Sequence, residues 1–405
     1  MLLFQEPEFL RSILEPYTSL VLGKYFNTGL LILYGLLFAG ILPLVPKRYK
    51  FSAILTASIL FALISAPLGN FLIFGGFVCI LYLCSNYEFQ GKTIVFWATE
   101  AAMLASSMVL FETTGYHSAF YAFAAYYTMF RSIHYFVDVR QGALQKVRFR
   151  EYLGYLLFFP AFSHGPIDRI SLMQPESVTR QHLAFGAKRI LIGISKYLIL
   201  VYILSDIERV SFSFSQFWQW LLFSAYGNAI QLYVLLSGDI DIVIGISSLM
   251  GFRVSENYPK VPYLQYNLTK FWQNWQSTIV NWLTAYVYFP LCRNRKYIYL
   301  KTMLIIMIIG WLHLLYNFKG FPSINLIMYY TLWGIFLGGA LALSKIIERK
   351  KVENKEYLMG SHPLLGRIVY ADNVMTKALA VFITFTIIAI GWNSPFYLIL
   401  TQLQF

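Results

Sequence analysis

The sequence predicts an all-α fold, a polytopic bundle of about ten to twelve membrane-spanning helices with short or re-entrant helices around a central funnel. Hydrophobic residues make up 58% of the 405 residues and charged residues only 13%, against about 25% charged in an average soluble domain. Apolar runs recur along the chain, with short clusters of Lys and Arg between them. We therefore expect a single domain over residues 1–405, a multi-pass protein of the cell (cytoplasmic) membrane in contact with the lipid bilayer.

The charge balance and the cysteines exclude other classes of protein. A net charge of +13 would suit nucleic acid, but the positive-inside rule accounts for basic clusters between spans, so no nucleic-acid partner is expected. The spacing of the three cysteines indicates neither a disulfide framework nor a metal site, and we expect no metal and no bound cofactor. Acidic residues interrupt the first apolar run, so we expect no cleavable signal peptide and insertion through the first true span.

The first third of the chain predicts five crossings. Their apolar runs lie at 27–45, 51–67, 69–85, 93–111 and 117–137. Basic residues follow the first and the fifth run, whereas the intervening turns near Pro67 and Glu112 carry no positive charge. This asymmetry places the N-terminus outside and both basic loops in the cytoplasm.

The middle of the chain predicts irregular elements. LLFFPAF is too short to span and runs into residues 163–169, which indicates a re-entrant element lining the funnel. Spans at 186–205 and 214–236 precede a polar interruption made by Ser237, Gly238, Asp239 and Asp241, then a short segment at 242–250 and a polar loop at 251–270.

Residues 271–290 form an aromatic element in which Trp272, Trp275, Trp282 and Tyr286 recur at steps of three and four residues, typical of one helical face. An interfacial aromatic belt is the alternative interpretation. A basic tract at 293–301, spans at 302–317 and 324–344, a charged loop at 345–357 and a last span at 376–392 complete the chain.

His313 is the first candidate for chemistry, because an ionisable side chain inside an apolar span is costly unless it serves a site. An imidazole can take the proton of a hydroxyl as that hydroxyl attacks. The alternative is a core histidine satisfied by Asn317. His164, beside Gly165 and Pro166, is a candidate for a pocket, and the other four histidines favour solvated or packed positions.

Other chemistries lack their motifs. The sequence contains no GxSxG nucleophile elbow, no glycine-rich phosphate loop, no HExxH helix and no CxxC pair. A channel or ion transporter would need acidic residues within spans, and only Asp239 and Asp241 come close.

Four ordered segments, LLFFPAFSHGPIDRI, LLSGDIDIVIGISSLMGFRVSENYPKVPYL, TKFWQNWQSTIVNWLTAYVYFPL and IIGWLHLLYN, resemble the membrane-bound O-acyltransferase family over about residues 120–350. The similarity is to its bacterial alginate O-acetylase and teichoic-acid D-alanyl transfer branch. The resemblance implies a multi-helix enzyme with a central funnel. Such an enzyme moves an acyl group from a cytoplasmic donor to a hydroxyl on or beyond the outer face.

The resemblance also assigns residues. His313, in GWLH, matches the family's catalytic histidine and would act as general base, and residues 237–241 match a segment that shapes the funnel wall. The tryptophans of the aromatic element match a passage lining. Gln276 replaces a second histidine, and a leucine stands on each side of His313, which implies lower activity or a different substrate. The predicted substrate-binding residues are Trp272, Trp275, Gln276, Trp282, Asn317, His164 and Asp241.

The resulting prediction is an O-acyltransferase of the acetyl or D-alanyl class. The enzyme class that we assign is narrower: O-acyltransferases that transfer groups other than amino-acyl or D-alanyl. Its donor would be acyl-CoA or an acyl-carrier-protein thioester, docked at a basic cytoplasmic face made by Arg293, Arg295, Lys296 and Lys301. The acceptor would be a cell-envelope polysaccharide or a partner protein, with an extracytoplasmic acyltransferase as partner. Two alternatives stay open: a catalytically degenerate scaffold that recruits such a transferase, and a polymer-precursor transporter.

Overall fold

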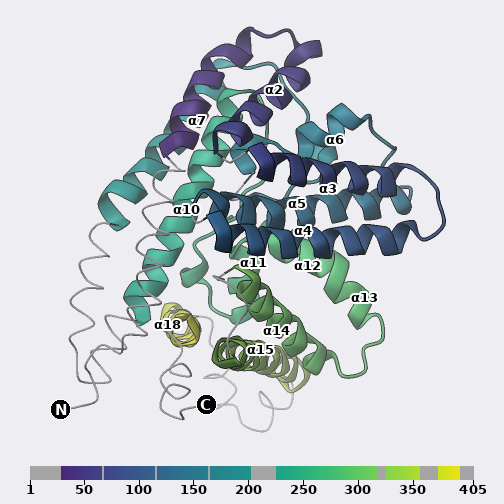
Figure 1. Cartoon of the computed structure of the whole chain (residues 1–405). Helices are drawn as coiled ribbons and strands as arrows, with labels where there is room; N and C mark the ends of the chain where they lie inside the picture. Colours follow the sequence, from purple (N-terminus) through teal and green to yellow (C-terminus); the bar gives the residue numbers. More distant parts are fainter. Residues whose placement is uncertain are drawn as a thin grey trace. The chain divides into compact units, whose positions relative to one another are not determined.

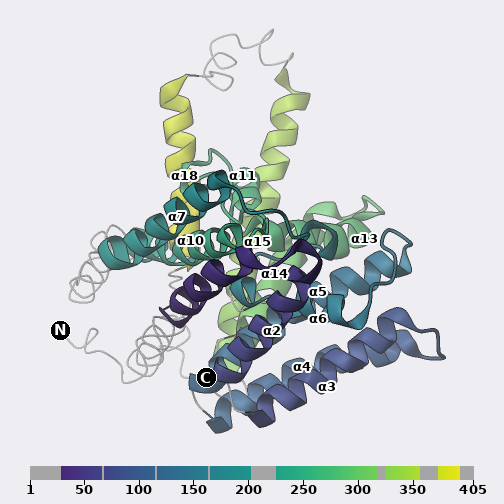
Figure 2. The same ribbon diagram turned by 90° about the horizontal axis from the view of Figure 1, so that it is seen from above.

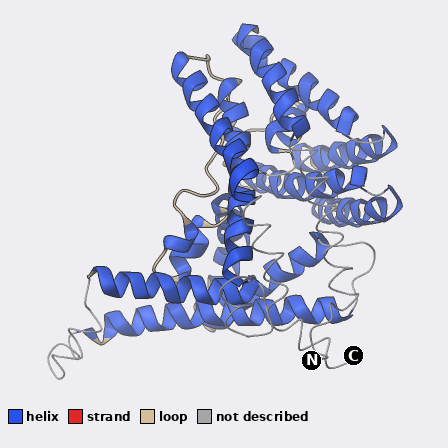
Figure 3. Cartoon of the chain, turned by 90° about the vertical axis from the view of Figure 1, so that its left-hand side faces the viewer, coloured by secondary structure: helices blue, strands red, loops and turns tan. Residues whose placement is uncertain are grey.

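The computed structural model describes seven stretches of the chain: residues 29–65, 68–114, 116–162, 165–201, 225–316, 324–355 and 373–392. In these stretches every regular element is a helix and no strand occurs, as Figure 3 shows, apart from one isolated bridge between Pro175 and Phe252. The predicted all-α class is therefore confirmed. The chain divides into two compact units, and each is described by itself.

The first unit comprises residues 1–200 and 234–256, with 318–320. Its N-terminal helices match the predicted runs: α2 (Lys47–Ser65), α3 (Leu68–Asn86), α4 (Lys92–Thr114) and α5 (Tyr116–Arg140). The connection from α3 to α4 contains Gly91 with φ +78°, a left-handed conformation that favours glycine. Helices α3, α4 and α5 pack against one another in a layer that Figure 2 shows from the side.

The apolar stretch at residues 154–162 is buried and too short to span, as the sequence predicts. Helix α6 (Phe149–Leu156) ends before a 3₁₀ turn at Phe159–Ala161, and the chain then runs without regular structure to a second turn at Ile170–Leu172. The side chain of Arg131, fully buried in α5, donates hydrogen bonds to the carbonyls of Leu156, Ala161 and Pro166. One guanidinium thus satisfies backbone oxygens that lack helical partners.

Helix α7 (Arg180–Ser195) continues into a π-helical turn at Lys196–Val201 and packs against α10 (Tyr226–Leu249). The two helices approach closely at glycines seven residues apart. A Cβ on Gly193 would lie 2.8 Å from the carbonyl oxygen of Gly238, and one on Gly186 would lie 2.8 Å from that of Gly245. Only glycine allows such an approach of two backbones.

The predicted polar interruption at residues 237–241 is wrong, because α10 runs through it without a break. The acidic side chains are paired with groups from the α7 segment instead: Asp241 with Arg189 and Lys196, and Asp239 with the hydroxyl of Tyr197. A polar residue within an apolar helix ends that helix only when no neighbouring element supplies its partner.

The second unit comprises residues 201–233, 257–317 and 321–405. Its described helices are α11 (Leu268–Asn274), α12 (Ser277–Leu283), a π-helical turn at Thr284–Tyr288, α13 (Phe289–Cys292), α14 (Ile298–Tyr316), α15 (Ile324–Glu353) and α18 (Val374–Trp392). Helices α14 and α15 form its most extensive helix pair, visible side by side in Figure 1. The predicted charged loop at 345–357 is wrong in its first part, because α15 stays helical to Glu353.

Four of the described helices are long and apolar enough to cross a membrane. They are Leu68–Asn86, Tyr226–Leu249, Ile324–Glu353 and Val374–Trp392, and the shorter apolar helices are Gly29–Leu44 and Ile298–His313. A membrane-embedded helical protein is therefore supported, and the total of about ten to twelve crossings stays a prediction.

Candidate active site

His313 lies near the end of α14, and its ring is held from two sides. Its Nδ1 atom lies 2.7 Å from the carbonyl oxygen of Ile309, one turn earlier in the same helix. A carbonyl oxygen only accepts hydrogen bonds, so Nδ1 carries a hydrogen, and in the neutral imidazole Nε2 then keeps its lone pair. The ring is thus oriented with a proton-accepting nitrogen directed away from its own helix backbone.

The neighbouring helix α15 supplies the other contacts of the imidazole. The ring centroids of Trp333 and Tyr330 lie 5.6 Å and 6.2 Å from that of His313. Close approach of the helices depends on Gly310, where a Cβ would lie 2.8 Å from the carbonyl oxygen of Tyr330. The indole nitrogen of Trp311 donates to the hydroxyl of Thr331 at 3.0 Å, which fixes the register of the two helices.

The core-histidine alternative stays open. The Ile309 carbonyl satisfies Nδ1 of His313, and Asn317, the partner that the alternative requires, lies outside the described residues. The His313 side chain is exposed, so it is not sealed among packed side chains.

The aromatic element is not one continuous helix, so the prediction that its tryptophans share one helical face is wrong. The helix ends at Asn274, and Gln276 adopts a left-handed conformation with φ 46° and ψ 52° before α12 begins. The buried side chain of Asn257 organises this break. Its amide nitrogen donates to Oε1 of Gln276 at 2.7 Å, and its Oδ1 accepts from the Thr278 hydroxyl at 2.5 Å.

Trp275 lies at the centre of a buried aromatic cluster. Its ring centroid lies 4.3 Å from that of Trp392 on α18, 5.5 Å from that of Tyr258 and 5.7 Å from that of Phe271. Tyr263 also contacts this cluster, at 6.1 Å from Trp275. These contacts explain why Trp275 is buried by packing alone, and a contact of Trp275 with substrate stays a prediction.

Trp272 differs from Trp275 because its polar atom is not satisfied. The side chain is 8% exposed, and its indole N–H has no hydrogen-bond partner. The buried hydroxyl of Thr269, three residues earlier and therefore on the same face of α11, also has none. Trp282 is buried beside Tyr286, with ring centroids 5.3 Å apart. The free indole N–H makes Trp272 the tryptophan best suited to hold a polar atom of a substrate.

Asp241 belongs to the first unit, and its carboxylate forms ion pairs with neighbouring cations. One carboxylate oxygen lies 2.7 Å from Nε of Arg189, and the other lies 2.5 Å from Nζ of Lys196, which also donates to the hydroxyl of Ser237. Arg189 also pairs with Glu256 at 2.7 Å. Both oxygens of Asp241 are therefore held by cations, and its predicted substrate contact stays untested. The two cations are seven residues apart in the sequence, a spacing that could have indicated one helical face.

His164 lies outside the described residues, but the segment that follows it is fixed by two buried anchors. Arg131 holds the carbonyl of Pro166, and the carboxylate of Asp168 accepts a hydrogen bond from the backbone N–H of Ser255 at 2.9 Å. The Tyr155 hydroxyl donates to the carbonyl of Asp168 at 2.8 Å. Sequence reasoning did not single out Arg131, although an arginine inside the apolar run at 117–137 was a signal.

The basic side chains predicted to bind the donor gather at one turn of the second unit. Arg293, Arg295 and Lys296 are exposed between α13 and α14, and Nζ of Lys301 closes the turn by donating to the carbonyl of Asn294 at 2.7 Å. Lys301 is therefore partly structural, whereas the side chains of the other three are exposed, with Nζ of Lys296 lying 5.1 Å from the ring centroid of Tyr297.

Comparison with known proteins agrees with this arrangement. The model of the membrane-bound O-acyltransferase family matches residues 92–313, a stretch that ends at the candidate histidine. A protein described as a probable alginate O-acetylase of Pseudomonas syringae pv. tomato is 28% identical over 274 residues, which cover 65% of this chain and 46% of that protein. The teichoic acid D-alanyltransferase of Streptococcus thermophilus is 24% identical over 291 residues, or 66% of each chain.

A third relative is the peptidoglycan O-acetyltransferase of Helicobacter pylori, 26% identical over 212 residues, or 49% of this chain and 37% of that protein. The matched part thus spans about half the length of the alginate O-acetylase relative and less of the peptidoglycan one. The presence of a D-alanyltransferase among the relatives leaves the predicted exclusion of amino-acyl transfer without support.

Proposed function

Because the chain belongs to the membrane-bound O-acyltransferase family, we propose that it transfers an acyl group from a cytoplasmic thioester to a hydroxyl of a cell-envelope polysaccharide or a partner protein. The relatives are named for O-acetylation of alginate and peptidoglycan and for D-alanylation of teichoic acid. Acetyl and D-alanyl groups are therefore the two acyl classes to test. The extracytoplasmic acyltransferase partner belongs to the same proposal.

The single observation that carries the proposal is the tautomer of His313. With Nδ1–H donated to the Ile309 carbonyl, Nε2 is available to accept a proton, which is the state that a general base needs. The rings of Trp333 and Tyr330 restrict the imidazole to this orientation.

The reaction conserves atoms and charge as follows. The acceptor hydroxyl oxygen attacks the thioester carbonyl carbon, and a carbon–oxygen bond forms while Nε2 of His313 takes the hydroxyl proton. The carbon–sulfur bond then breaks, and the same proton passes to the departing sulfur, which leaves as a thiol. The indole N–H of Trp272 is a candidate donor for the thioester or the acceptor, because it is buried without a partner in the same unit.

The exposed basic turn supports a donor that carries phosphate. Both acyl-CoA and an acyl-carrier protein present phosphate groups, and Arg293, Arg295 and Lys296 offer exposed cations. Long-range attraction between such groups raises the rate of encounter and weakens with salt. Transfer at low donor concentration should accordingly fall as ionic strength rises.

The decisive experiment replaces His313, the proposed general base, with alanine. Purified protein in lipid nanodiscs is supplied with acetyl-CoA or a D-alanyl carrier protein and with a soluble envelope polysaccharide, and both thiol release and ester formation are followed. His313→Ala should lower ester formation by about 10² to 10⁴-fold, the usual contribution of general-base catalysis.

His182 provides the matched control. It lies in the first turn of α7, where its backbone N–H bonds to the Thr179 side chain, and His182→Gln should leave transfer unchanged. Full ester formation by His313→Ala would overturn the assignment. Wild-type protein that binds the thioester but never releases thiol would instead favour the scaffold alternative.

A further inference from the structure

Helices α4 and α5 of the first unit carry a line of buried polar atoms that the proposed reaction does not use. Two points fix how the antiparallel helices face each other. At the first point, Glu100 of α4 contacts Ser132 of α5. At the second point, Ser107 and Ala125 line the same pocket; Ser107 lies seven residues after Glu100 on α4, and Ala125 lies seven residues before Ser132 on α5. At about 1.5 Å per residue, the two points lie about 10 Å apart along the helices.

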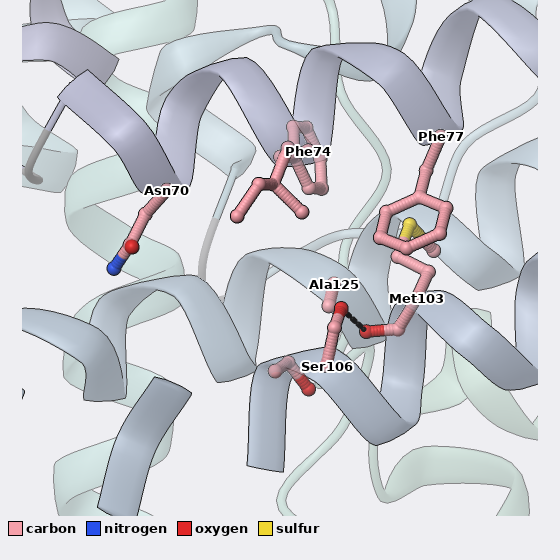
Figure 4. A pocket seen from close by; sticks show the side chains of 8 residues that line it. Asn70, Phe74, Phe77, Met103, Ser106 and Ala125 are labelled. Carbon is pink, nitrogen blue, oxygen red and sulfur yellow. Dashed lines mark hydrogen bonds between the residues drawn. The ribbon is translucent and has the colours of Figure 1, made fainter. Parts of the chain in front are cut away.

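The pocket in Figure 4 marks one end of this line. It is partly open, contains about 240 Å³ of space including its mouth, and is walled mainly by apolar side chains of α3 and α4. Asn70 of α3, only 6% exposed, lines it, and the amide nitrogen of Asn70 has no hydrogen-bond partner. Ser106, on the α4 wall, donates to its own helix at the carbonyl of Met103 (2.8 Å).

Glu100 lies at the other end of this line of buried polar atoms, and no cation among the described residues pairs with its carboxyl group. Its side chain is 3% exposed, and its Oε2 atom has no hydrogen-bond partner. Among the described residues no Lys, Arg or His pairs with Glu100, and its other oxygen, Oε1, bonds to the hydroxyl of Ser132. An isolated carboxylate costs far more to bury than a neutral carboxylic acid.

The hydrogen bonds of Ser132 also indicate that Glu100 is protonated. Its oxygen contacts both Oε1 of Glu100 and the carbonyl oxygen of Met129, the latter at 2.8 Å. A serine hydroxyl has one hydrogen and cannot donate to both oxygens fully. If that hydrogen goes to the Met129 carbonyl, the Glu100 contact is favourable only when Glu100 carries a proton and donates it to Ser132.

Two further unsatisfied hydroxyls lie along the route. Thr128 is fully buried, with no partner for Oγ1, and it is four residues from Ser132 and three from Ala125 on α5, between the two ends. Tyr152 of α6 is also fully buried with an unpartnered hydroxyl, and its ring centroid lies 4.9 Å from that of Tyr135, which is three residues beyond Ser132 on α5. Buried polar atoms without protein partners are the usual positions of internal water.

We propose that Asn70, Thr128, Tyr152 and Glu100 form a hydrated polar track in which Glu100 binds a proton that exchanges with water through the pocket. The ligands are one proton and one or more water molecules. The packed helices also carry other titratable groups, which include Cys84 on α3, Arg131, His134 and Tyr135 on α5 and Tyr155 on α6. Arg131 is directed at backbone carbonyls rather than at Glu100.

Infrared spectroscopy of the full chain in nanodiscs at neutral pH tests the proposal. The wild-type minus Glu100→Gln difference spectrum should contain the carbonyl band of a protonated carboxylic acid, and this band should shift in D₂O because the proton exchanges. Thr128→Val should slow the exchange by roughly tenfold, the effect of removing about one hydrogen-bonding partner. Thr128→Ser keeps the hydroxyl and should keep the wild-type rate.

Glu88→Gln is the matched control, because Glu88 is exposed and paired with Lys92 at 2.5 Å. It should leave the band intact. If Glu100→Gln does not fold, reaction of wild-type protein with an apolar carbodiimide, which attacks protonated carboxyls, should label Glu100 in mass spectrometry. A missing acid band or missing label, a band unaffected by D₂O, unchanged exchange in Thr128→Val, or loss of the band on adding Na⁺ would each overturn the proposal.

Discussion

Asp241 and His313 are both ionisable side chains within apolar helices, but they differ in burial and in the partners that their polar atoms have. Asp241 is 4% exposed, and both of its oxygens are held by cations from the α7 segment. His313 is exposed and bonds through one ring nitrogen to a backbone carbonyl, and the other ring nitrogen has no hydrogen-bond partner among the described residues. Asp241 therefore holds helices together, whereas His313 keeps the environment that the proposed general base would need. Depth in an apolar helix alone does not distinguish these two cases.

The largest effect on stability should come from replacing Asp241, whose two carboxylate oxygens are both held by cations. Asp241→Ala leaves the charges of Arg189 and Lys196 without their shared partner, and removing one member of a buried ion pair typically costs about 3 to 5 kcal/mol. We expect a strongly lowered midpoint of thermal unfolding in detergent. His313→Ala, measured alongside, should keep a midpoint close to that of the wild type, and equal losses in both variants would remove the distinction.

A smaller effect, on activity, should come from Trp272. Trp272→Phe keeps the aromatic ring and removes the buried N–H that has no partner, so the free energy of unfolding should stay the same or rise. If that N–H contacts the donor or the acceptor, ester formation should fall by about tenfold, the equivalent of about 1.4 kcal/mol.

Trp275→Phe is the control for Trp272, because Trp275 is held by ring contacts. It should lower the unfolding midpoint more than it lowers the rate per folded molecule. The reverse ranking, with Trp275 controlling the rate and Trp272 controlling stability, would contradict the assignment of roles.

The smallest effect should come from Gln276. Gln276→Gly relieves a left-handed backbone conformation that costs an ordinary residue about 1 kcal/mol or more, but it removes the hydrogen bond from Asn257, which contributes a similar amount. The net change in the free energy of unfolding should therefore lie within about 1 kcal/mol of zero, as measured by chemical denaturation. Gln276→Ala loses the bond without the relief and should be less stable than Gln276→Gly.

Much of the fold could be predicted from hydropathy. The predicted runs at 51–67, 69–85 and 93–111 correspond to α2, α3 and α4, because a continuous apolar stretch bounded by charged or turn residues dictates a helix locally. The short element after α5 was also predicted, since LLFFPAF with its proline cannot span. The predicted helix across Trp275 was wrong, because the tertiary bonds of Asn257 hold Gln276 in a conformation that the pattern of apolar residues does not reveal.

The candidate site was only partly predictable. His313 was singled out because one imidazole in an apolar run is conspicuous, and the family model ends on that residue. Asn257 and Arg131 were not singled out, because their partners are distant in the sequence: Asn257 bonds to the side chains of Gln276 and Thr278, and Arg131 bonds to backbone carbonyls. His164 and Asn317 lie outside the described residues, so their predicted contacts stay predictions.

The sequence by itself determined that this is an all-helical membrane protein and which histidine to examine, because burial of apolar side chains in lipid and the cost of an isolated imidazole are properties of short stretches. Only the tertiary structure decided which polar residues are satisfied. Hydrogen bonds and ion pairs between helices join residues tens of positions apart, such as Arg189 to Asp241, and no local pattern records which side chain will meet which.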